Sequence, residues 1–468
     1  MKNYLAFDLG ADSGRAMLGT IAGSKLTLDE LHRFPNTPVR VTTGLYWDTF
    51  RLFHDIQHGL FVAGKERKLS IDGIGVDTWG VDFGLLGADG SVVDNPRHYR
   101  DARNDGILEK TFAVVPREEI FAHTGIQFMQ FNSLFQLYAT KLAGTAGLEV
   151  ADKLMFMPDL FNYWLTGVMR AELTIASTSQ FYNPVKKTWA TELLDKLGLP
   201  ARILPEIVMP GALLGPLLEP IAEYSGLGPV PVYASAGHDT AAAVAAVPAK
   251  GSDWCYISSG TWSLMGVELD EPLINDKVLA ANYTNEIGFG GKVRFLKNIA
   301  GMWLLQECRR SWMAEGQEYS YEELTRLASE AKPKLAKIDP DVFLQPGNMP
   351  ARIAEYCRST GQQEPRTTGE FCRVILESLA EKYRQVLENL VALTGRRINV
   401  IHIVGGGSRN RLLNQLVAEA TGRKVVAGPS EATAIGNVMV QAVGAGDVAG
   451  LDQAREIIKQ SFPIEEVG

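Results

Sequence analysis

The first part of the chain alternates between short apolar runs and turns rich in glycine. Residues 4–7 and 16–21 are apolar over the length of a strand, and residues 10–14 between them have the composition of a turn. Residues 26–34 continue the strand pattern, and residues 71–77 return to it. These runs predict a sheet that begins with a β-hairpin.

A helix is predicted between the strand at 26–34 and the strand at 71–77. Asp48 occupies an N-cap position, and apolar side chains follow it at helical spacing at Phe50, Phe53, Ile56 and Leu60. Residues 83–86 and 91–93 then predict a second hairpin. Residues 104–225 read as mostly helical and irregular.

The second half of the chain repeats the opening order. Residues 254–266 predict another strand, turn and strand, and the longest helix is expected from about residue 370 to 393, ending at Gly395. Further helices are predicted at 302–314, 320–331, 410–421 and 431–443, and a buried strand at 399–404.

The turns that open the two halves are alike. Ser13-Gly14-Arg15 resembles Ser259-Gly260-Thr261, and the two glycines are 260 − 14 = 246 positions apart, about half the chain. We interpret this likeness as an internal duplication of an α/β unit. Coincidence between two turns of small residues is the alternative.

Composition limits the classes of function. The 468 residues carry a formal net charge of −8 and are 46% hydrophobic, which is typical of a globular protein of about two to four domains. The acidic balance argues against nucleic-acid binding and against a role at a membrane surface. No apolar stretch approaches about 18 residues, and the four cysteines form no CxxC pair. We therefore expect a soluble, cytoplasmic protein with reduced thiols.

The glycine-rich turn near the start could bind phosphate. Asp8 ends an apolar run, and Ser13 and Arg15 follow it in or beside the turn. Backbone N–H groups in such a turn can approach a phosphate, and a carboxylate at a strand end suits Mg²⁺, usually through water. An ordinary hairpin with a solvated Asp8 is the structural alternative. A P-loop and a Rossmann motif are both excluded, because no GxxxxGK[ST] occurs and a strand follows the turn.

Two carboxylates, Asp77 and Asp82, flank an aromatic side chain and a glycine after the strand at 71–77. The segment could form one wall of a sugar pocket, with Trp79 as its apolar face and Gly80 allowing close approach. Burial in the core is the commoner fate of a tryptophan in a strand.

His238 and Asp239 stand immediately before a predicted helix of small residues. The free N–H groups and the dipole of a helix N-terminus keep a carboxylate ionised, so Asp239 could accept a proton from a substrate hydroxyl. An N-cap aspartate with no further role is the alternative.

Two turns in the second half suit a nucleotide. Thr261 could hydrogen-bond a phosphate, and the three glycines at 405–407 could hold adenine or ribose against the backbone, although a turn with a helix cap also explains them. The remaining candidate site segments are residues 100–103 and 296–298. For both, a solvated charged loop without a functional role is the alternative. The histidines show no metal-ligand spacing, so a structural zinc site is not expected.

Taken together, these segments resemble the FGGY carbohydrate kinases over nearly the whole chain, and within them the rhamnulokinase branch. DLGADSGR, SSGTWSLMG and IVGGGSRN are similar to the family's first phosphate, second phosphate and adenosine motifs. Segments similar to that branch follow in the same order, namely DTWGVDF, YRDAR, GIQF, LMFMPD, HDT, AANYTNE and LKNIAGMWLLQ.

The resemblance implies an α/β fold of two actin-like, RNase H-type domains that flank a catalytic cleft, which we expect at residues 1–245 and 246–468. It implies Mg²⁺-dependent transfer of the γ-phosphoryl group of ATP to a ketose, and for the rhamnulokinase branch the formation of L-rhamnulose 1-phosphate from L-rhamnulose in L-rhamnose catabolism. Asp239 would be the general base, and the sugar would contact Gly80, His238, Asp239, Thr240 and Asn298. ATP would contact Ala11, Asp12, Ser13, Gly14, Arg15, Thr261, Gln306 and Gly406, and Asp8 would help to place Mg²⁺.

Three other functions stay open from the sequence. A sugar-sensing regulator is disfavoured, because a basic DNA-binding extension is found at neither end. Of the other two, the first is a kinase for another ketose, such as L-fuculose or L-xylulose. The second is an actin-like ATPase without sugar chemistry, which is disfavoured because a nucleotide clamp needs neither the HDT segment nor the LKN segment. The oligomeric state is not predicted.

Overall fold

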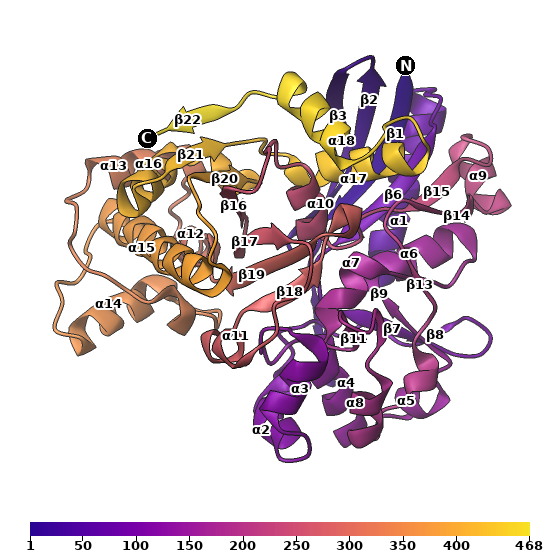
Figure 1. Ribbon diagram of the computed structural model, residues 1–468, viewed down its shortest axis with the longest axis horizontal. Helices are drawn as coiled ribbons and strands as arrows, with labels where there is room; N and C mark the ends of the chain where they lie inside the picture. The colour runs from indigo at the N-terminus through magenta and orange to yellow at the C-terminus, as the bar shows by residue number, and fades with distance from the viewer. The chain divides into compact units, whose positions relative to one another are not determined.

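The computed structural model describes all residues, Met1–Gly468 (Figure 1). The chain forms two compact units. Unit 1 consists of residues 1–248, 268–295 and 433–461, and unit 2 of residues 249–267, 296–432 and 462–468. Each unit is thus assembled from separate stretches of the chain. The predicted division of the sequence near residue 245 stays a prediction.

The central sheet of unit 1 has β1 in its interior. Residues 4–9 of β1 are all buried, as expected for a strand covered on both faces. β1 pairs antiparallel with β2 and parallel with β6, and β6 pairs parallel with β15. The carboxyl ends of β1, β6 and β15 therefore share one edge of the sheet, the edge at which open α/β sheets hold ligands. The strand order is β14 (Ala212–Pro216), β15 (Pro231–Ala234), β6 (Gly73–Thr78), β1 (Lys2–Leu9), β2 (Ser13–Ala22) and β3 (Lys25–Pro35).

Two helices from the end of the chain complete this unit, and they are coloured yellow beside β1–β3 in Figure 1. Asn437 on α17 (Ala432–Gly444) donates to the carbonyl oxygen of Gly75 at 3.3 Å and to Oδ2 of Asp77 at 2.6 Å. The backbone N–H of Leu26 donates to Oγ of Ser461, the last residue of α18 (Leu451–Ser461), at 2.8 Å. Residues more than 350 positions apart are thereby joined in one core.

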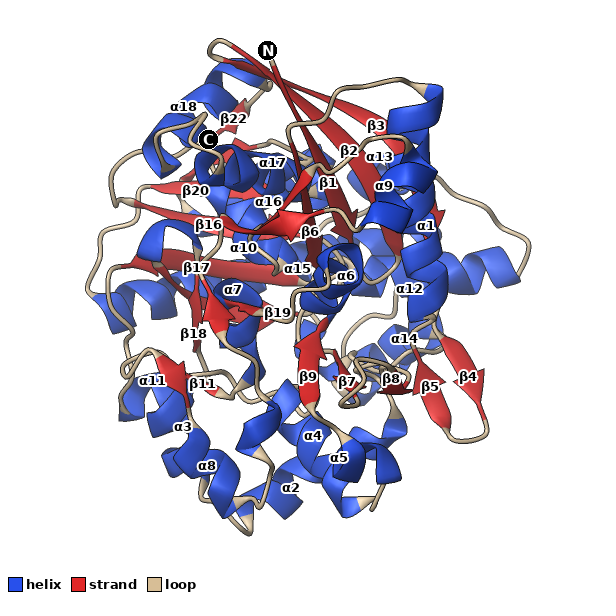
Figure 2. Ribbon diagram, turned by 90° about the vertical axis from the view of Figure 1, so that its right-hand side faces the viewer, coloured by secondary structure: helices blue, strands red, loops and turns tan.

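The other helices of unit 1 cover the sheet or follow it in the chain, and Figure 2 shows α1, α6 and α9 beside the strands. The α-helices are α1 (Thr49–Phe61), α2 (Ile107–Phe112), α3 (Arg117–Thr124), α4 (Ser133–Leu142), α5 (Ala146–Val150), α6 (Met157–Thr166), α7 (Leu173–Ala176), α8 (Thr191–Lys196), α9 (Glu219–Ser225), α10 (Asp239–Ala245) and α11 (Asp276–Ala281). A π-helical turn, η1 (Val62–Glu66), extends α1, and 3₁₀ turns are η2 (Ala102–Asn104), η3 (Ser177–Ser179), η4 (Ala201–Ile203) and η5 (Phe289–Gly291).

Short strands complete the description of unit 1. A three-stranded sheet has the order β8 (Val92–Asp94), β7 (Phe83–Leu86) and β9 (Lys153–Phe156). The two-stranded pairs are β4 (Val39–Val41) with β5 (Gly44–Tyr46), β10 (Ala171–Glu172) with β13 (Ile207–Val208), and β11 (Tyr182–Asn183) with β12 (Thr188–Trp189). β18 (Thr284–Ile287) also belongs to unit 1.

Unit 2 repeats the local topology of the first sheet. β16 pairs antiparallel with β17 and parallel with β20, and β20 pairs parallel with β21. The strands are β16 (Trp254–Ser259), β17 (Ser263–Leu269), β20 (Val400–Val404), β21 (Lys424–Ala427) and β22 (Glu465–Val467), and β19 (Val293–Ile299) enters from unit 1. The helices are α12 (Trp303–Ala314), α13 (Tyr321–Glu330), α14 (Met349–Ser359), α15 (Thr368–Thr394) and α16 (Arg411–Thr421), with 3₁₀ turns η6 (Pro340–Val342) and η7 (Gly406–Arg409).

The long helix α15 shows how local sequence sets its ends. Thr367 and Glu370 form a capping box, in which each side chain accepts a backbone N–H of the other residue. Gly395 ends the helix with a φ of +66°, a conformation that glycine adopts without strain. The prediction of a helix over about 370–393 is confirmed, with the start moved two residues earlier.

The predicted repeat is confirmed in topology but its alignment is wrong by four residues. The N–H of Gly10 donates to the carbonyl oxygen of Ser13 at 2.9 Å, and the N–H of Gly260 donates to that of Trp262 at 2.8 Å. Both glycines directly follow the first strand of their hairpin. Gly10 is therefore the structural counterpart of Gly260, whereas Gly14 lies inside β2.

Two predictions from composition bear on the environment of the protein. All four cysteines are free and buried, as expected for reduced thiols. None of the helices combines the length and the apolar character that crossing a membrane requires.

Candidate functional site

The predicted Mg²⁺ residue and the predicted sugar-site residues of unit 1 lie together at the carboxyl edge of the sheet. Asp8 is at the end of β1, Gly80 follows β6, and His238 follows β15 and precedes α10. Main-chain hydrogen bonds join these segments: Trp79 N–H donates to the Leu9 carbonyl at 3.1 Å, and Thr78 N–H donates to the Gly237 carbonyl at 2.9 Å. The topology thus brings together residues that are up to 230 positions apart.

The first turn, residues 10–15, is fixed by its neighbours. The Asn36 side chain donates to the Gly10 carbonyl at 2.9 Å, and the Asn36 backbone N–H donates to the Asp12 carbonyl at 3.1 Å. Arg15 forms an ion pair with Asp8. A Cβ atom on Gly14 would lie 2.2 Å from the Phe34 ring, so packing inside the protein accounts for that glycine.

Asp239 is the first residue of α10, and its side chain is 29% exposed. The N-cap residue is His238. The Asp239 carboxylate accepts from the backbone N–H and the hydroxyl of its neighbour Thr240, whereas an N-cap side chain accepts from the backbone N–H two or three residues further on. The N-cap alternative is therefore wrong. The expectation that the helix N-terminus keeps Asp239 ionised is wrong, because burial, and then the negative charge of Asp8, raise the pKa of Asp239 to about 7. Such a pKa still suits a group that exchanges protons near neutral pH.

Asp77 is a buried carboxylate beside this group. Its Oδ2 accepts from Asn437, while its Oδ1 is buried without a hydrogen-bond partner. Burial, and then Asp8, raise the pKa of Asp77 well above its usual range. No cluster of three or more His, Cys, Asp or Glu side chains is arranged to hold a metal ion. The carboxylates at this edge do not surround a metal ion, so Mg²⁺ would bind here mainly through water and phosphate oxygens.

Glu172 supports the segment that carries His238. The Glu172 carboxylate accepts the N–H of Gly237 at 2.9 Å and the hydroxyl of Thr174 at 2.6 Å, and Oγ1 of Thr174 in turn accepts the N–H of His238 at 3.2 Å. Glu172 is 1% exposed, and burial raises its pKa to about 7. Sequence reasoning missed this residue, because an isolated glutamate in an irregular region carries no motif.

Trp79 is part of the core, as its structural alternative predicts. It is 5% exposed, its ring centroid lies 4.1 Å from that of Trp47, and its indole N–H donates to Oδ2 of Asp82 at 3.0 Å. Trp47 donates to the same oxygen at 2.6 Å. Burial raises the pKa of Asp82 to about 6, and the two indoles hold it in place as an acceptor.

The predicted nucleotide residues of unit 2 form a second group. The N–H of Trp303, the first residue of α12, donates to the Thr261 carbonyl at 3.1 Å, which ties the turn of the β16–β17 hairpin to this helix. Gln306 lies in the first turn of α12, and its Oε1 is buried without a hydrogen-bond partner. An amide oxygen in this state is suited to meet a donor on a ligand.

The three glycines at 405–407 differ in what requires them. Gly405 has a φ of +83°, and a Cβ atom on Gly407 would lie 2.0 Å from Oγ of Ser259. A Cβ atom on Gly406 would meet nothing within 4 Å. The fold itself explains the first and third glycines, so Gly406 is the one whose open space a ligand can use.

Two segments first given a solvated loop as their alternative are ordered parts of the fold. Residues 296–298 lie in β19, with Leu296 fully buried and Asn298 partly buried. Asp101 is 6% exposed, and Arg103 donates to the side chains of Gln136 at 2.8 Å and Thr140 at 3.1 Å. The predicted site residues thus divide between the units. Unit 1 holds Asp8, Ala11, Asp12, Ser13, Gly14, Arg15, Gly80, His238, Asp239 and Thr240, and unit 2 holds Thr261, Asn298, Gln306 and Gly406.

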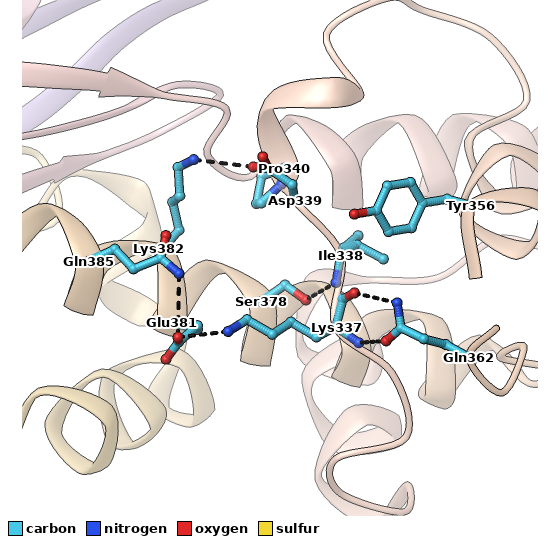
Figure 3. Close-up of a pocket in the computed structure, with 10 residues that line it drawn as sticks. All are labelled: Lys337, Ile338, Asp339, Pro340, Tyr356, Gln362, Ser378, Glu381, Lys382 and Gln385. Carbon is cyan, nitrogen blue, oxygen red and sulfur yellow. Dashed lines mark hydrogen bonds and ion pairs between the residues drawn. The ribbon is translucent and has the colours of Figure 1, made fainter. Parts of the chain in front are cut away.

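A pocket of about 370 Å³ lies within unit 2, between α15 and the segment before η6 (Figure 3). Lys337 pairs with Glu381 at 2.7 Å, and Lys382 pairs with Asp339 at 3.2 Å. Ile338 N–H donates to the Ser378 hydroxyl at 3.0 Å. The charged side chains neutralise one another, and none of the predicted site residues lines this pocket.

Comparison with known proteins covers both units. Residues 3–246 match the N-terminal domain model, and residues 255–445 the C-terminal domain model, of the FGGY family of carbohydrate kinases. The chain is 48% identical to the rhamnulokinase of Bacteroides thetaiotaomicron, over 99% of this chain and 95% of that protein, and 41% identical to the rhamnulokinase of Enterococcus faecalis, over 99% and 94%. Its fold is similar to that of a gluconate kinase from Lactobacillus acidophilus, with a TM-score of 0.80, 17% identity, and coverage of 99% of this chain and 92% of that one.

Proposed function

Because the chain belongs to the FGGY family of carbohydrate kinases and has the two-domain actin-like fold of that family, we propose that it phosphorylates L-rhamnulose at O1 with ATP as the donor. The observation that carries the proposal is Asp239, a carboxylate with a raised pKa at the ligand-holding edge of the sheet. The similarity to rhamnulokinases over nearly the full chain supports L-rhamnulose as the ketose. We place the reaction in the cytoplasm, because the four cysteines are free, as is usual for proteins of a reducing compartment.

Asp239 acts as the general base in this proposal. It accepts the proton of the C1 hydroxyl as that oxygen attacks the γ-phosphorus of ATP and ADP leaves. His238 is a poor competitor for this proton, because burial, and then the charge of Arg294, lower the pKa of its imidazole well below the usual range. The sugar is held by Gly80, His238, Thr240 and Asn298 together with Asp239.

The nucleotide is assigned to the two hairpin turns and their neighbours. We assign the phosphates to residues 11–15 and to Thr261, and the adenosine to Gln306 and Gly406, whose open space and unpaired oxygen support this choice. Mg²⁺ bound near Asp8 would neutralise phosphate charge as it develops. Asp8 and the neighbouring Asp77 are the carboxylates placed at the end of β1 and β6, where this ion would lie.

A coupled assay of ADP release tests the proposal. The purified chain is given Mg-ATP with L-rhamnulose, L-fuculose, L-xylulose or no sugar. We expect the highest kcat/KM with L-rhamnulose, and only slow ADP release without sugar, because water is poorly placed to accept the phosphoryl group. A higher kcat/KM with another ketose would transfer the proposal to that sugar, and rapid sugar-independent ADP release would favour the ATPase alternative.

A further inference from the structure

Two buried charged residues lie directly behind His238, and the proposed reaction gives neither of them a role. Arg294 on β19 is 0% exposed and Glu286 on β18 is 4% exposed, while His238 itself is 7% exposed. All three residues belong to unit 1. Buried ionised groups are costly to an enzyme unless they are paired, so their presence beside the sugar site calls for an explanation.

The contacts give each group a defined partner. Nη2 of Arg294 lies 3.0 Å from Nδ1 of His238 and 3.1 Å from Oε2 of Glu286. Nε of Arg294 donates to the Ile287 carbonyl at 3.3 Å, which fixes the plane of the guanidinium. Oε2 of Glu286 also lies 3.5 Å from Nδ1 of His238, which is longer than a normal hydrogen bond. Glu286 thus neutralises Arg294, and Arg294 is the nearer partner of Nδ1.

This arrangement decides which nitrogen of His238 carries the proton. A guanidinium has only donors and stays protonated, so Nδ1 of His238 must present its lone pair to Arg294. A neutral imidazole has one N–H, which must then be on Nε2. Nε2 lies 3.4 Å from Oδ1 of Asp239, and 3.2 Å from the place that a Cβ atom of residue 80 would occupy. The N–H on Nε2 therefore points to the sugar site, and Gly80, which has no side chain, leaves it uncovered.

We propose that Arg294 and Glu286 are positioning residues that lock His238 in the Nε2–H form, so that His238 donates a hydrogen bond to an acceptor oxygen of the sugar. The identity of the sugar rests on the proposed function, whereas the Nε2–H form of His238 is independent of it. In this form His238 offers no lone pair to the acceptor side, and proton transfer from the sugar hydroxyl is left to Asp239. A glycine at position 80 keeps the N–H accessible.

Nitrogen NMR of the full chain with ¹⁵N-labelled histidine tests the lock without any substrate. The signals of His238 are identified by their loss in His238→Asn. We expect a protonated Nε2 and an unprotonated Nδ1 from pH 6 to 8 in the native protein. Arg294→Met should release the lock, giving a mixture of the two forms, and Arg294→Lys should retain it in part because a donor remains. A native His238 with its proton on Nδ1 would overturn the proposal.

Sugar kinetics give a second readout, with Arg455→Met as the matched control. Arg455 is also a buried arginine of unit 1, 2.9 Å from its partner Glu268, and neither of these residues contacts His238 in the structure. Removing a hydrogen bond to a charged group costs about 10- to 100-fold, so we expect Arg294→Met to lower kcat/KM for the sugar by that factor and to change KM for ATP less than about twofold. The control should lower thermal stability and leave both constants and the His238 signals unchanged.

Glu286→Gln covers the case in which Arg294→Met does not fold. This variant keeps the shape of the side chain and removes the charge that neutralises Arg294. We therefore expect a higher KM for the sugar, with the His238 proton still on Nε2. Equal losses in Arg294→Met and Arg455→Met, with no change in the His238 signals, would show that Arg294 is only a packing residue. If no ketose is phosphorylated at all, the NMR result still decides the proposal.

Discussion

The turns of the two equivalent hairpins have a similar backbone pattern and different chemical surroundings. In each, the N–H of a glycine directly after the first strand bonds within the turn, and that strand has a parallel neighbour. In unit 1 the register of β1 and β6 places Asp8 beside Asp77. In unit 2 the register of β16 and β20 places Ser258 beside Val404, at the start of the glycine turn. One scaffold thus presents carboxylates in the first unit and neutral turns in the second.

This difference teaches how a repeated topology can serve two ligands. Burial, and then repulsion from Asp8, raise the pKa of Asp77 and Asp239 in unit 1, so that these carboxylates attract a cation or a proton. The neutral turns of unit 2 offer backbone groups and open space, which suit phosphate and adenosine. Topology fixes where a site lies, and the charge of a few strand-end residues fixes what the site can do.

The largest expected effect is on the acidic side of the comparison. Asp239→Asn should fold normally and lose about 10²- to 10⁴-fold in kcat, the usual contribution of a positioned general base. Steady-state kinetics with the best ketose measure this. Asp276→Asn is the control, because Asp276 is likewise the first residue of a helix, α11. A loss below tenfold in Asp239→Asn would show that Asp239 is not the base.

On the neutral side, Gly406→Val should raise KM for ATP by about tenfold or more, because a branched side chain enters space that the protein leaves open. Its melting temperature and its affinity for the ketose should stay close to the native values, as measured by calorimetry. Gly407→Ala is the contrasting variant, since its Cβ atom would collide with Ser259 and should lower stability instead. Selective loss of sugar binding in Gly406→Val would contradict the assignment.

The acid limb of the rate profile should report the raised pKa of Asp239. Its base form is lost as the pH falls through about 7, so kcat/KM should fall about tenfold per pH unit below that value. An aspartate in water would keep its rate down to about pH 4. Profiles at limiting sugar, run with and without added salt, test this. A flat rate between pH 5 and 7 would show that burial and the charge of Asp8 do not raise the pKa of a catalytic Asp239 as proposed.

The smallest effect concerns Gly14, which the fold uses for packing. Gly14→Ala should lower the free energy of unfolding by about 1–3 kcal/mol, the usual cost of overpacking, because its Cβ atom would press on the Phe34 ring. Denaturant titration measures the change, and Gly14→Ala combined with Phe34→Leu should recover part of it. A stable Gly14→Ala variant with weakened ATP binding would instead show that Gly14 serves the phosphate site and not the packing against Phe34.

Local patterns predicted the hairpins, the long helix and the residues in glycine turns, because each of these depends on neighbours in sequence. The alignment of the repeat failed, since small residues occur at both Gly10 and Gly14 and only the strand pairing distinguishes them. Arg294 and Glu286 were missed because their role appears only when β18 and β19 come to lie beside α10. A charged residue between Val293 and Phe295 in an apolar run was the one available signal.

The route of the chain through unit 1 has a consequence for synthesis on the ribosome. Asn437 bonds to the β6 strand, and a Cβ atom on Gly436 would lie 1.8 Å from the Ala242 carbonyl, so α17 fits against α10 without a gap. The strands of this unit emerge first, yet the helices that complete it emerge only near residue 461. The nascent sheet must wait, with apolar surface exposed, for almost the whole of translation. Chaperone capacity should therefore limit the yield of this protein more than its final stability does.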